Sequence, residues 1–301
     1  NGVATNDATQ NWTAKFENGT LTLRGLNLTV QASEQTQGID ATTGDLTINL
    51  IGKNSITQNG THNAIRAWFG LTISGTGTLT VRDSAHSSSS LIYANGKIEI
   101  KEGAVIDAAK TGGSAQTINA HGGNLTVTGS NTSVKAVNHG SDENSDAIRV
   151  DLSSGTGNAT VTVKGSAVLE AETKSSSAKA INGTVVATDY AGKIKAGESK
   201  AMAIAWTDSS AVALNTYKYV RIGEEEPNYL TFTAQEAKST ISLKWKSADQ
   251  NSVYISKNDG TTWDSYTAGK TITLTNVGDK VSFKGKNVTT DFSNHFTMSG
   301  K

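Results

Sequence analysis

A short apolar step that recurs along the first two thirds of the chain limits the possible folds more than any other feature. One copy is Ala64-Ile65-Arg66-Ala67, in which an isoleucine has alanines close by on both sides. The central isoleucines of successive copies lie 23 to 33 residues apart: Ile39, Ile65, Ile92, Ile118, Ile148, Ile181 and Ile204. A repeat of this length with variable insertions is typical of a solenoid, in which each repeat buries its apolar face against the next one.

Two further apolar runs accompany each copy. Runs of the type Leu71-Thr72-Ile73 begin at residues 46, 71, 98, 125 and 161, and a second set begins at residues 79, 105, 133 and 168. Three short strands per repeat favour a parallel β-helix, because leucine-rich repeats are shorter and propeller blades need about forty residues and four strands. We therefore predict a right-handed parallel β-helix of about six to eight coils, with buried columns of isoleucine, leucine and valine.

The composition agrees with an all-β chain. Apolar residues alternate with polar ones in short runs, Gly-rich steps separate the runs, and helical periodicity is nearly absent. The chain has no cysteine, which excludes disulfides and thiolate metal sites, and its five histidines show no metal-ligand spacing. Its formal net charge is zero, so no basic patch points to nucleic acid, and no apolar run is long enough for a membrane helix.

The organisation of the sequence changes near residue 223. The segment "GEEEPNY" (223–229) joins acidic residues to the only proline and predicts a linker. Alternating apolar runs follow it and predict a small antiparallel β-sandwich over residues 223–301. Residues 1–222 then form the β-helix, with residues 1–18 as a cap in which Trp12 and Phe16 close the first coil. A solenoid closed at both ends leaves no bare strand edge, so we expect a monomer.

Several phrases of the sequence resemble known families. The segments "GTLTLRGLNLTV" (19–30), "GDLTINLIGKNSIT" (44–57) and "GLTISGTGTLTV" (70–81) resemble repeat units of β-helical surface proteins of gut bacteria that are classed as carbohydrate-binding. Residues 228–301 resemble a small β-sandwich module found beside leucine-rich repeats in bacterial surface adhesins. The phrases that carry this second resemblance are "YLTFTA", "DGTTWDSYT" and "GDKVSFKG".

The resemblance implies where such a protein works and what it contacts. It implies an exported protein, secreted or anchored at the cell surface or outer membrane after its signal is removed. Its expected partner is extracellular polysaccharide or a host or cell-surface glycoprotein. Some β-helical relatives bind acidic or cellulosic polysaccharide, and the resemblance supplies no catalytic residue.

Strand geometry predicts a candidate ligand-binding face beside the isoleucines. If the isoleucines point inward, the residues that follow them point outward, because successive side chains of a strand alternate. One outward column is then Asp40, Arg66, Tyr93, Asn119, Arg149, Asn182 and Ala205. Two residues further on, a second column is Thr42, Trp68, Asn95, His121, Asp151, Thr184 and Thr207.

The middle of these columns combines aromatic, cationic and amide side chains. Coils stack about 4.8 Å apart, close to the length of one sugar unit in an extended polysaccharide. Aromatic faces could stack on sugar rings, and arginines could take carboxylates or sulfates in bidentate fashion. A merely solvated polar face is the alternative. The candidate ligand-binding residues are Asp40, Arg66, Trp68, Tyr93, Asn119, His121, Arg149, Asp151 and Asn182.

Two other functions stay open at this stage. A polysaccharide lyase needs a cation, held by several carboxylates, beside a basic residue, and Asp146, Arg149 and Asp151 are the candidates. The acidic loop with Asp142, Glu143 and Asp146 is a weak calcium candidate, and no other cofactor is expected. Three or more carboxylates around one cation beside Arg66 or Arg149 would indicate the lyase. A purely structural stalk would need no ligand, and a non-catalytic binding protein is the function we expect.

Overall fold

The computed structural model contains two compact units, residues 1–224 and 225–301, each with its own hydrophobic core. It describes residues 12–34, 36–84, 88–152, 158–190, 193–206, 211–223, 230–245, 253–257, 264–267, 269–285 and 296–300. Strands dominate both units, so the prediction of an all-β chain is confirmed. Among the described residues, no helix has the length and apolar character needed to cross a bilayer.

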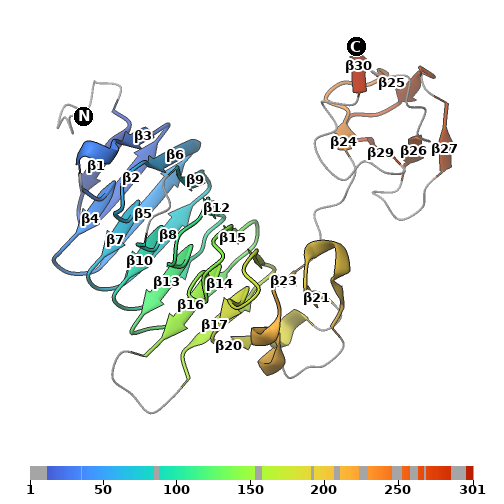
Figure 1. Cartoon of the computed structure of the whole chain (residues 1–301). Helices are drawn as coiled ribbons and strands as arrows, with labels where there is room; N and C mark the ends of the chain where they lie inside the picture. Colours follow the sequence, from blue (N-terminus) through green and yellow to red (C-terminus); the bar gives the residue numbers. More distant parts are fainter. Residues whose placement is uncertain are drawn as a thin grey trace. The chain divides into compact units, whose positions relative to one another are not determined.

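The first unit is a parallel β-solenoid of about six turns, as predicted (Figure 1). Each turn contributes one strand to each of three sheets. Sheet A has the order β1 (Ala14–Glu17), β2 (Thr20–Arg24), β5 (Leu46–Ile51), β8 (Leu71–Gly75), β11 (Ile98–Ile100), β14 (Leu125–Thr128), β17 (Thr160–Lys164) and β20 (Thr184–Val186). Sheet C has the order β4 (Ile39–Ala41), β7 (Ile65–Ala67), β10 (Ile92–Ala94), β13 (Ile118–His121), β16 (Ile148–Asp151) and β19 (Ile181–Asn182).

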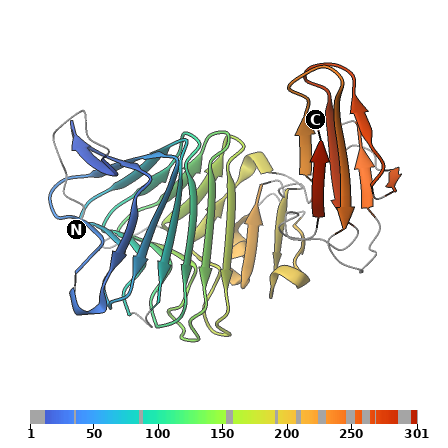
Figure 2. The same cartoon turned by 90° about the horizontal axis from the view of Figure 1, so that it is seen from above.

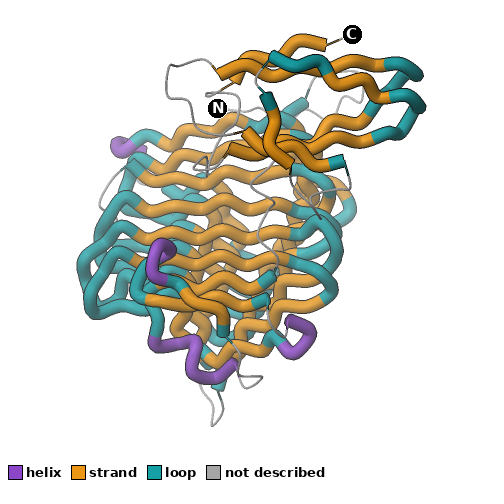
Figure 3. The backbone as a smooth tube through the Cα atoms, turned by 90° about the vertical axis from the view of Figure 1, so that its right-hand side faces the viewer, coloured by secondary structure: helices purple, strands orange, loops and turns teal. Residues whose placement is uncertain are grey.

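Sheet B completes the turns and then changes direction. Its order is β3 (Asn27–Val30), β6 (Lys53–Gln58), β9 (Thr78–Asp83), β12 (Val105–Lys110), β15 (Ser133–Asn138), β18 (Val168–Thr173), β23 (Tyr219–Ile222), β21 (Ile194–Gly197) and β22 (Ile204–Ala205). The pairs from β3 to β18 are parallel, whereas β23, β21 and β22 are antiparallel to their neighbours. Successive turns stack as parallel rungs in Figures 2 and 3.

The predicted apolar columns form the solenoid core. On sheet C, Ile65 is in register with Ile39 on one side and with Ile92 on the other. The column continues through Ile118, Ile148 and Ile181. The isoleucines from Ile65 onward are almost completely buried. Burying one β-branched or leucine side chain contributes roughly 1.5–3 kcal/mol, so these columns fix the register of every turn.

A column of buried polar side chains ends the strands of sheet B and anchors the loops that lead into sheet C. Its members are Gln58, Asp83, Lys110, Asn138 and Thr173. The Lys110 ammonium lies 3.4 Å from an Asp83 carboxylate oxygen and donates to the Ser89 carbonyl at 2.9 Å. Burial lowers the pKa of Lys110, and the charge of Asp83 opposes that shift. Because buried polar groups need partners, the column holds the loops in one conformation.

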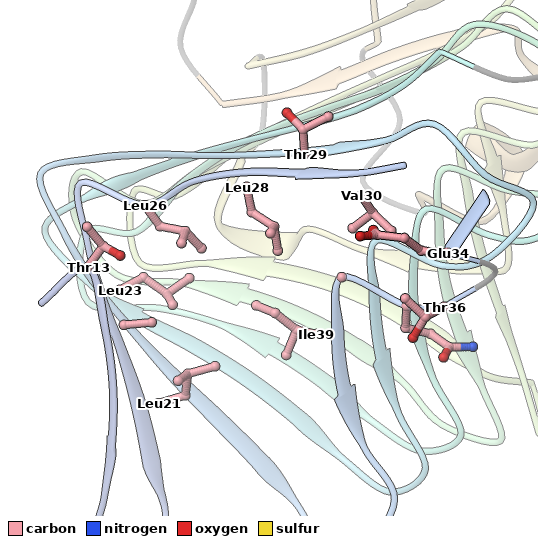
Figure 4. Close-up of a pocket in the computed structure, with 13 residues that line it drawn as sticks. Thr13, Leu21, Leu23, Leu26, Leu28, Thr29, Val30, Glu34, Thr36 and Ile39 are labelled. Carbon is pink, nitrogen blue, oxygen red and sulfur yellow. The ribbon is translucent and has the colours of Figure 1, made fainter. Parts of the chain in front are cut away.

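At the N-terminal end of the solenoid, the described residues differ from part of the predicted cap. Phe16 lies on β1 with 62% of its surface exposed, so it does not close the first coil. Trp12 instead packs against the Arg24 guanidinium, 4.4 Å from the ring centroid. A cavity of about 380 Å³ remains between β2, β3 and the start of β4, with Leu26, Leu28 and others on its walls (Figure 4). Residues 1–11 lie outside the described residues.

The C-terminal end of the solenoid is covered by residues of the same unit. The 3-10 helix η2 (Thr188–Tyr190) buries Tyr190, whose hydroxyl donates to the Ala167 carbonyl at 2.7 Å. The 3-10 helix η4 (Ala211–Thr216) packs on β19 and β20 and buries Leu214 completely. Two more short 3-10 helices are η1 (Ala32–Glu34) and η3 (Lys200–Met202).

The prediction of a seventh repeat around Ile204 is wrong, because this segment pairs within sheet B instead of sheet C. Ile204 lies on β22, which is antiparallel to β21 in sheet B, and it is 68% exposed. The chain reverses direction after the sixth turn, so no seventh strand joins sheet C in the described part of the chain.

The second unit consists of two small antiparallel sheets around one core, in agreement with the predicted fold. One sheet has the order β24 (Leu230–Thr233), β29 (Lys280–Gly285), β26 (Val253–Ser256) and β27 (Asp264–Tyr266). The other has the order β28 (Ile272–Leu274), β25 (Ser239–Trp245) and β30 (Phe296–Gly300). Leu243 and Leu274 of one sheet share the core with Val281 and Phe283 of the other.

Candidate ligand-binding face

The outward columns of sheet C have the predicted register. Arg66 is paired with Asp40 and with Tyr93 in the neighbouring strands. Tyr93 is aligned with Asn119, and Asn119 with Arg149, which is aligned in turn with Asn182. In the second column His121 is in register with Asp151. Eight of the nine candidates therefore lie in register along sheet C, and Trp68 directly follows β7; we call this surface the sheet C face.

Two other positions of the two columns, Ala205 and Thr184, do not join the sheet C face. Ala205 lies on β22 in sheet B, because the chain has already reversed there. Thr184 is the first residue of β20 in sheet A, since only Gly183 separates β19 from β20 and leaves no corner residue. Thr207 lies outside the described residues.

Arg66 joins a charge partner to an aromatic ring. Its guanidinium donates from Nε to one oxygen of Asp40 at 2.8 Å and from a terminal nitrogen to the other at 2.6 Å. The same group lies 5.3 Å from the centroid of the Trp68 ring, a cation–π geometry. The hydrogen bonds to Asp40 raise the pKa of Arg66, with burial opposing them. Arg66 is therefore held on both sides.

Tyr93, His121 and Asp151 form a second connected group. The rings of Tyr93 and His121 stack with centroids 6.2 Å apart and an interplanar angle of 26°. The Nδ1 atom of His121 lies 2.7 Å from an Asp151 carboxylate oxygen. Burial is the main cause that raises the pKa of Tyr93, and the charge of Asp151 adds to it. Tyr93 thus remains a neutral phenol at physiological pH.

Asn119 contributes to the support of this face more than to its surface. Only 9% of the residue is exposed, and its amide nitrogen donates to Gln116 at 3.1 Å. Gln116 in turn donates to the Asn144 carbonyl and accepts from Ser90. These bonds tie three successive loops to the centre of the sheet C face.

Arg149 and Asn182 share one buried carboxylate, that of Asp146. Asp146 accepts from Arg149 Nε at 2.9 Å, from Asn182 at 2.9 Å and from the backbone amide of Lys179 at 2.8 Å. Arg149 also donates to the side-chain oxygen of Asn144 at 3.1 Å. Asp146 is buried, so it orders this end of the face instead of pointing to solvent.

The weak calcium candidate is not assembled. Asp142 accepts from the Asn144 backbone amide at 2.9 Å, which closes a local turn, while Asp146 bonds to Arg149 and Asn182. Glu143 lies in the same exposed loop as Asp142. Across the described ranges, no three His, Cys, Asp or Glu side chains gather as a metal site requires.

One exposed aromatic residue next to the face, Phe69, is not among the candidates predicted from the sequence. Phe69 follows Trp68 in the corner between β7 and β8, and their exposed fractions are 50% and 43%. The inward alanine at Ala67 and the buried Gly70 leave both rings on the outside of this corner. Two adjacent aromatic residues between alanine and glycine could have indicated from the sequence that both rings are exposed at this corner.

Comparison with other proteins adds no identification. No protein-family model matches the chain, and no curated protein or solved structure is significantly similar to it. Function is therefore proposed from the geometry of the sheet C face, on which the Arg66–Trp68 pair and the group of Tyr93, His121 and Asp151 lie on neighbouring strands.

Proposed function

We propose that this chain is a non-catalytic binding protein, exported to the cell surface, whose sheet C face binds extracellular polysaccharide. The observation that carries the proposal is an aromatic platform along parallel sheet C and its adjoining corner. The platform consists of Trp68, Phe69, Tyr93 and His121. Flat aromatic rings pair with the apolar faces of sugar rings, and their burial dominates the energetics of many interfaces.

The platform is held rigid before any ligand arrives. Arg66 fixes the Trp68 ring from one side, and Asp151 fixes His121 against Tyr93. Preorganised side chains lose less conformational entropy on binding, which favours affinity. A solenoid that served only as a stalk would not require these exposed aromatic residues to be positioned by their neighbours.

The arrangement of carboxylates favours binding over the lyase alternative. Arg66 bonds to the carboxylate of Asp40 and Arg149 to that of Asp146, and among the described residues no three acidic or histidine side chains gather around one point. A calcium-dependent lyase would need several carboxylates converging on one cation. The resemblance of the repeat units to exported carbohydrate-binding proteins supports the cell-surface location. The second unit would serve as an accessory or attachment module in this adhesin-like protein.

The proposal is tested by binding of the whole chain to a glycan array and to insoluble polysaccharides, with and without calcium. Trp68→Ala removes an exposed ring of the platform, and Phe16→Ala removes an exposed ring from β1, outside the face. We expect a glycan that binds the wild type and Phe16→Ala but not Trp68→Ala. Absence of binding to every glycan would overturn the proposal in favour of the stalk. Release of unsaturated uronate products would instead support the lyase.

A further inference from the structure

We propose that the sheet C face selects neutral, extended polysaccharide chains and discriminates against acidic ones. The inference deepens the proposed function and rests on it. It assigns to the arginines a structural task on the face, in place of the anion-binding task that their residue type alone suggests. The chain would lie along the stack, across β7, β10 and β13.

Each cationic group in the two outward columns already has a carboxylate partner within the protein. Both oxygens of Asp40 accept hydrogen bonds from Arg66, which is the bidentate geometry that an acidic sugar would otherwise use. Asp146 takes Arg149, whose second contact is the Asn144 amide oxygen. A sugar carboxylate or sulfate would have to displace one of these intramolecular partners.

Within the two outward columns, the charge balance also opposes an anionic ligand; Lys97, at the neighbouring corner, lies outside these columns. The two arginines of the columns are matched by Asp40 and Asp146, and Asp151 adds a further negative charge beside His121. Asp40 and Asp151 are partly exposed, with side-chain exposed fractions of 30% and 38%. An acidic polymer would therefore meet like charges, which weaken association.

A neutral sugar chain, in contrast, finds suitable partners at suitable intervals. Exposed carboxylate oxygens of Asp40 and Asp151 and the exposed amide of Asn95 can accept hydrogen bonds from sugar hydroxyls, because each oxygen has more than one lone pair. Trp68 and His121 occupy the same outward column two turns apart, with Asn95 between them. At about 4.8 Å per turn, the two rings of that column are about 9.6 Å apart, which is close to the advance of two sugar units.

The test uses pairs of polymers that share a backbone and differ in charge. Hydroxyethyl cellulose is compared with carboxymethyl cellulose, and highly methyl-esterified pectin with polygalacturonate, by affinity electrophoresis and isothermal titration of the whole chain. A panel of uncharged β-glucans, xylans and mannans accompanies them. We expect at least tenfold tighter binding to neutral than to charged chains, with little dependence on salt concentration, since ion release contributes little.

Two variants make the outcome specific. Asp40→Asn leaves Arg66 without its carboxylate, so binding to the charged polymers should rise by at least threefold relative to binding to the neutral ones. Trp68→Ala should weaken binding to both. Circular dichroism and thermal unfolding verify that each variant is folded.

The possible failures can be told apart. One failure is tighter binding of the charged polymers that salt weakens and that Arg66→Ala removes. In that case the proposed preference for neutral chains is wrong, although the face still binds glycan. If no polysaccharide of either kind binds, the proposed function itself fails.

Discussion

The Arg66 guanidinium contacts both carboxylate oxygens of Asp40, which lies one turn earlier in the solenoid, and its flat face lies 5.3 Å from the Trp68 ring. Arg66 therefore links two turns of sheet C and positions an aromatic residue at the same time. This relationship depends on the stacking of turns and on side-chain alternation, which points the residue after each isoleucine outward.

We expect the Asp40–Arg66 pair to contribute little to global stability. Both side chains are partly exposed, so a double-mutant cycle of Asp40→Asn and Arg66→Gln should give a coupling free energy of about 0.5–1 kcal/mol. Urea unfolding followed by circular dichroism measures it. A coupling several times larger would mean that this pair holds the turns together, contrary to its proposed task of orienting Trp68.

The buried Lys110–Asp83 pair should behave differently. Lys110→Met leaves the Asp83 carboxylate buried without its cation, which should lower the free energy of unfolding by about 3–5 kcal/mol. Arg82→Met is the matched control, because Arg82 pairs with Asp107 at the surface and its loss should cost about 0–1 kcal/mol. Equal costs for the two variants in urea unfolding would contradict the described burial of Lys110.

Alkaline pH should weaken the C-terminal cap through Tyr190. Burial raises the pKa of Tyr190 above its ordinary value of about 10, so the folded state keeps a proton that the unfolded chain releases. Stability contributed by this group is present below pH 10 and is lost as the pH rises toward the folded pKa. Tyr190→Phe should cost about 1 kcal/mol at pH 8, where it loses the bond to Ala167, and less at pH 11. Parallel pH profiles of wild type and variant would argue against this.

Gly123 should be indispensable to the corner beside His121. A Cβ atom at Gly123 would lie 2.4 Å from the Lys97 backbone nitrogen in the preceding turn. Gly123→Ala should therefore push the two turns apart at a cost of about 2–3 kcal/mol in urea unfolding. Gly44→Ala is the control, because a Cβ there meets nothing within 4 Å and only its positive φ is strained, at about 1 kcal/mol. A smaller cost at Gly123 than at Gly44 would be inconsistent with the close approach.

The stacking of turns could be predicted from the sequence because it depends on periodicity. Ile65, Ile92 and Ile118 are separated by nearly equal intervals, and only one strand register buries all three. Side-chain alternation along the strands also correctly predicted that Arg66 and Tyr93 point outward. It also carried a signal that was not used: in Ile106-Asp107-Ala108-Ala109-Lys110, alternation places Lys110 inward with Ile106.

Other features depend on contacts that no local pattern encodes. The local sequence around Ile204 has the form of a repeat. In the structure, however, β23 pairs antiparallel with β18 and ends the parallel stack of sheet B, so the segment around Ile204 does not form another turn. The pairing of Arg149 with Asp146 depends on the path of the loop between β15 and β16, which periodicity does not determine. Residue types alone suggested arginines open to an anion, whereas their partners in space satisfy them.

Isothermal titration of wild type, Trp68→Ala and Phe16→Ala with the glycan that the array identifies tests the central claim most directly. We expect Trp68→Ala to weaken binding at least tenfold, equivalent to about 1.4 kcal/mol, and Phe16→Ala to bind as the wild type does. Equal affinity of all three proteins would show that the ligand binds elsewhere and would contradict a polysaccharide-binding role for the sheet C face.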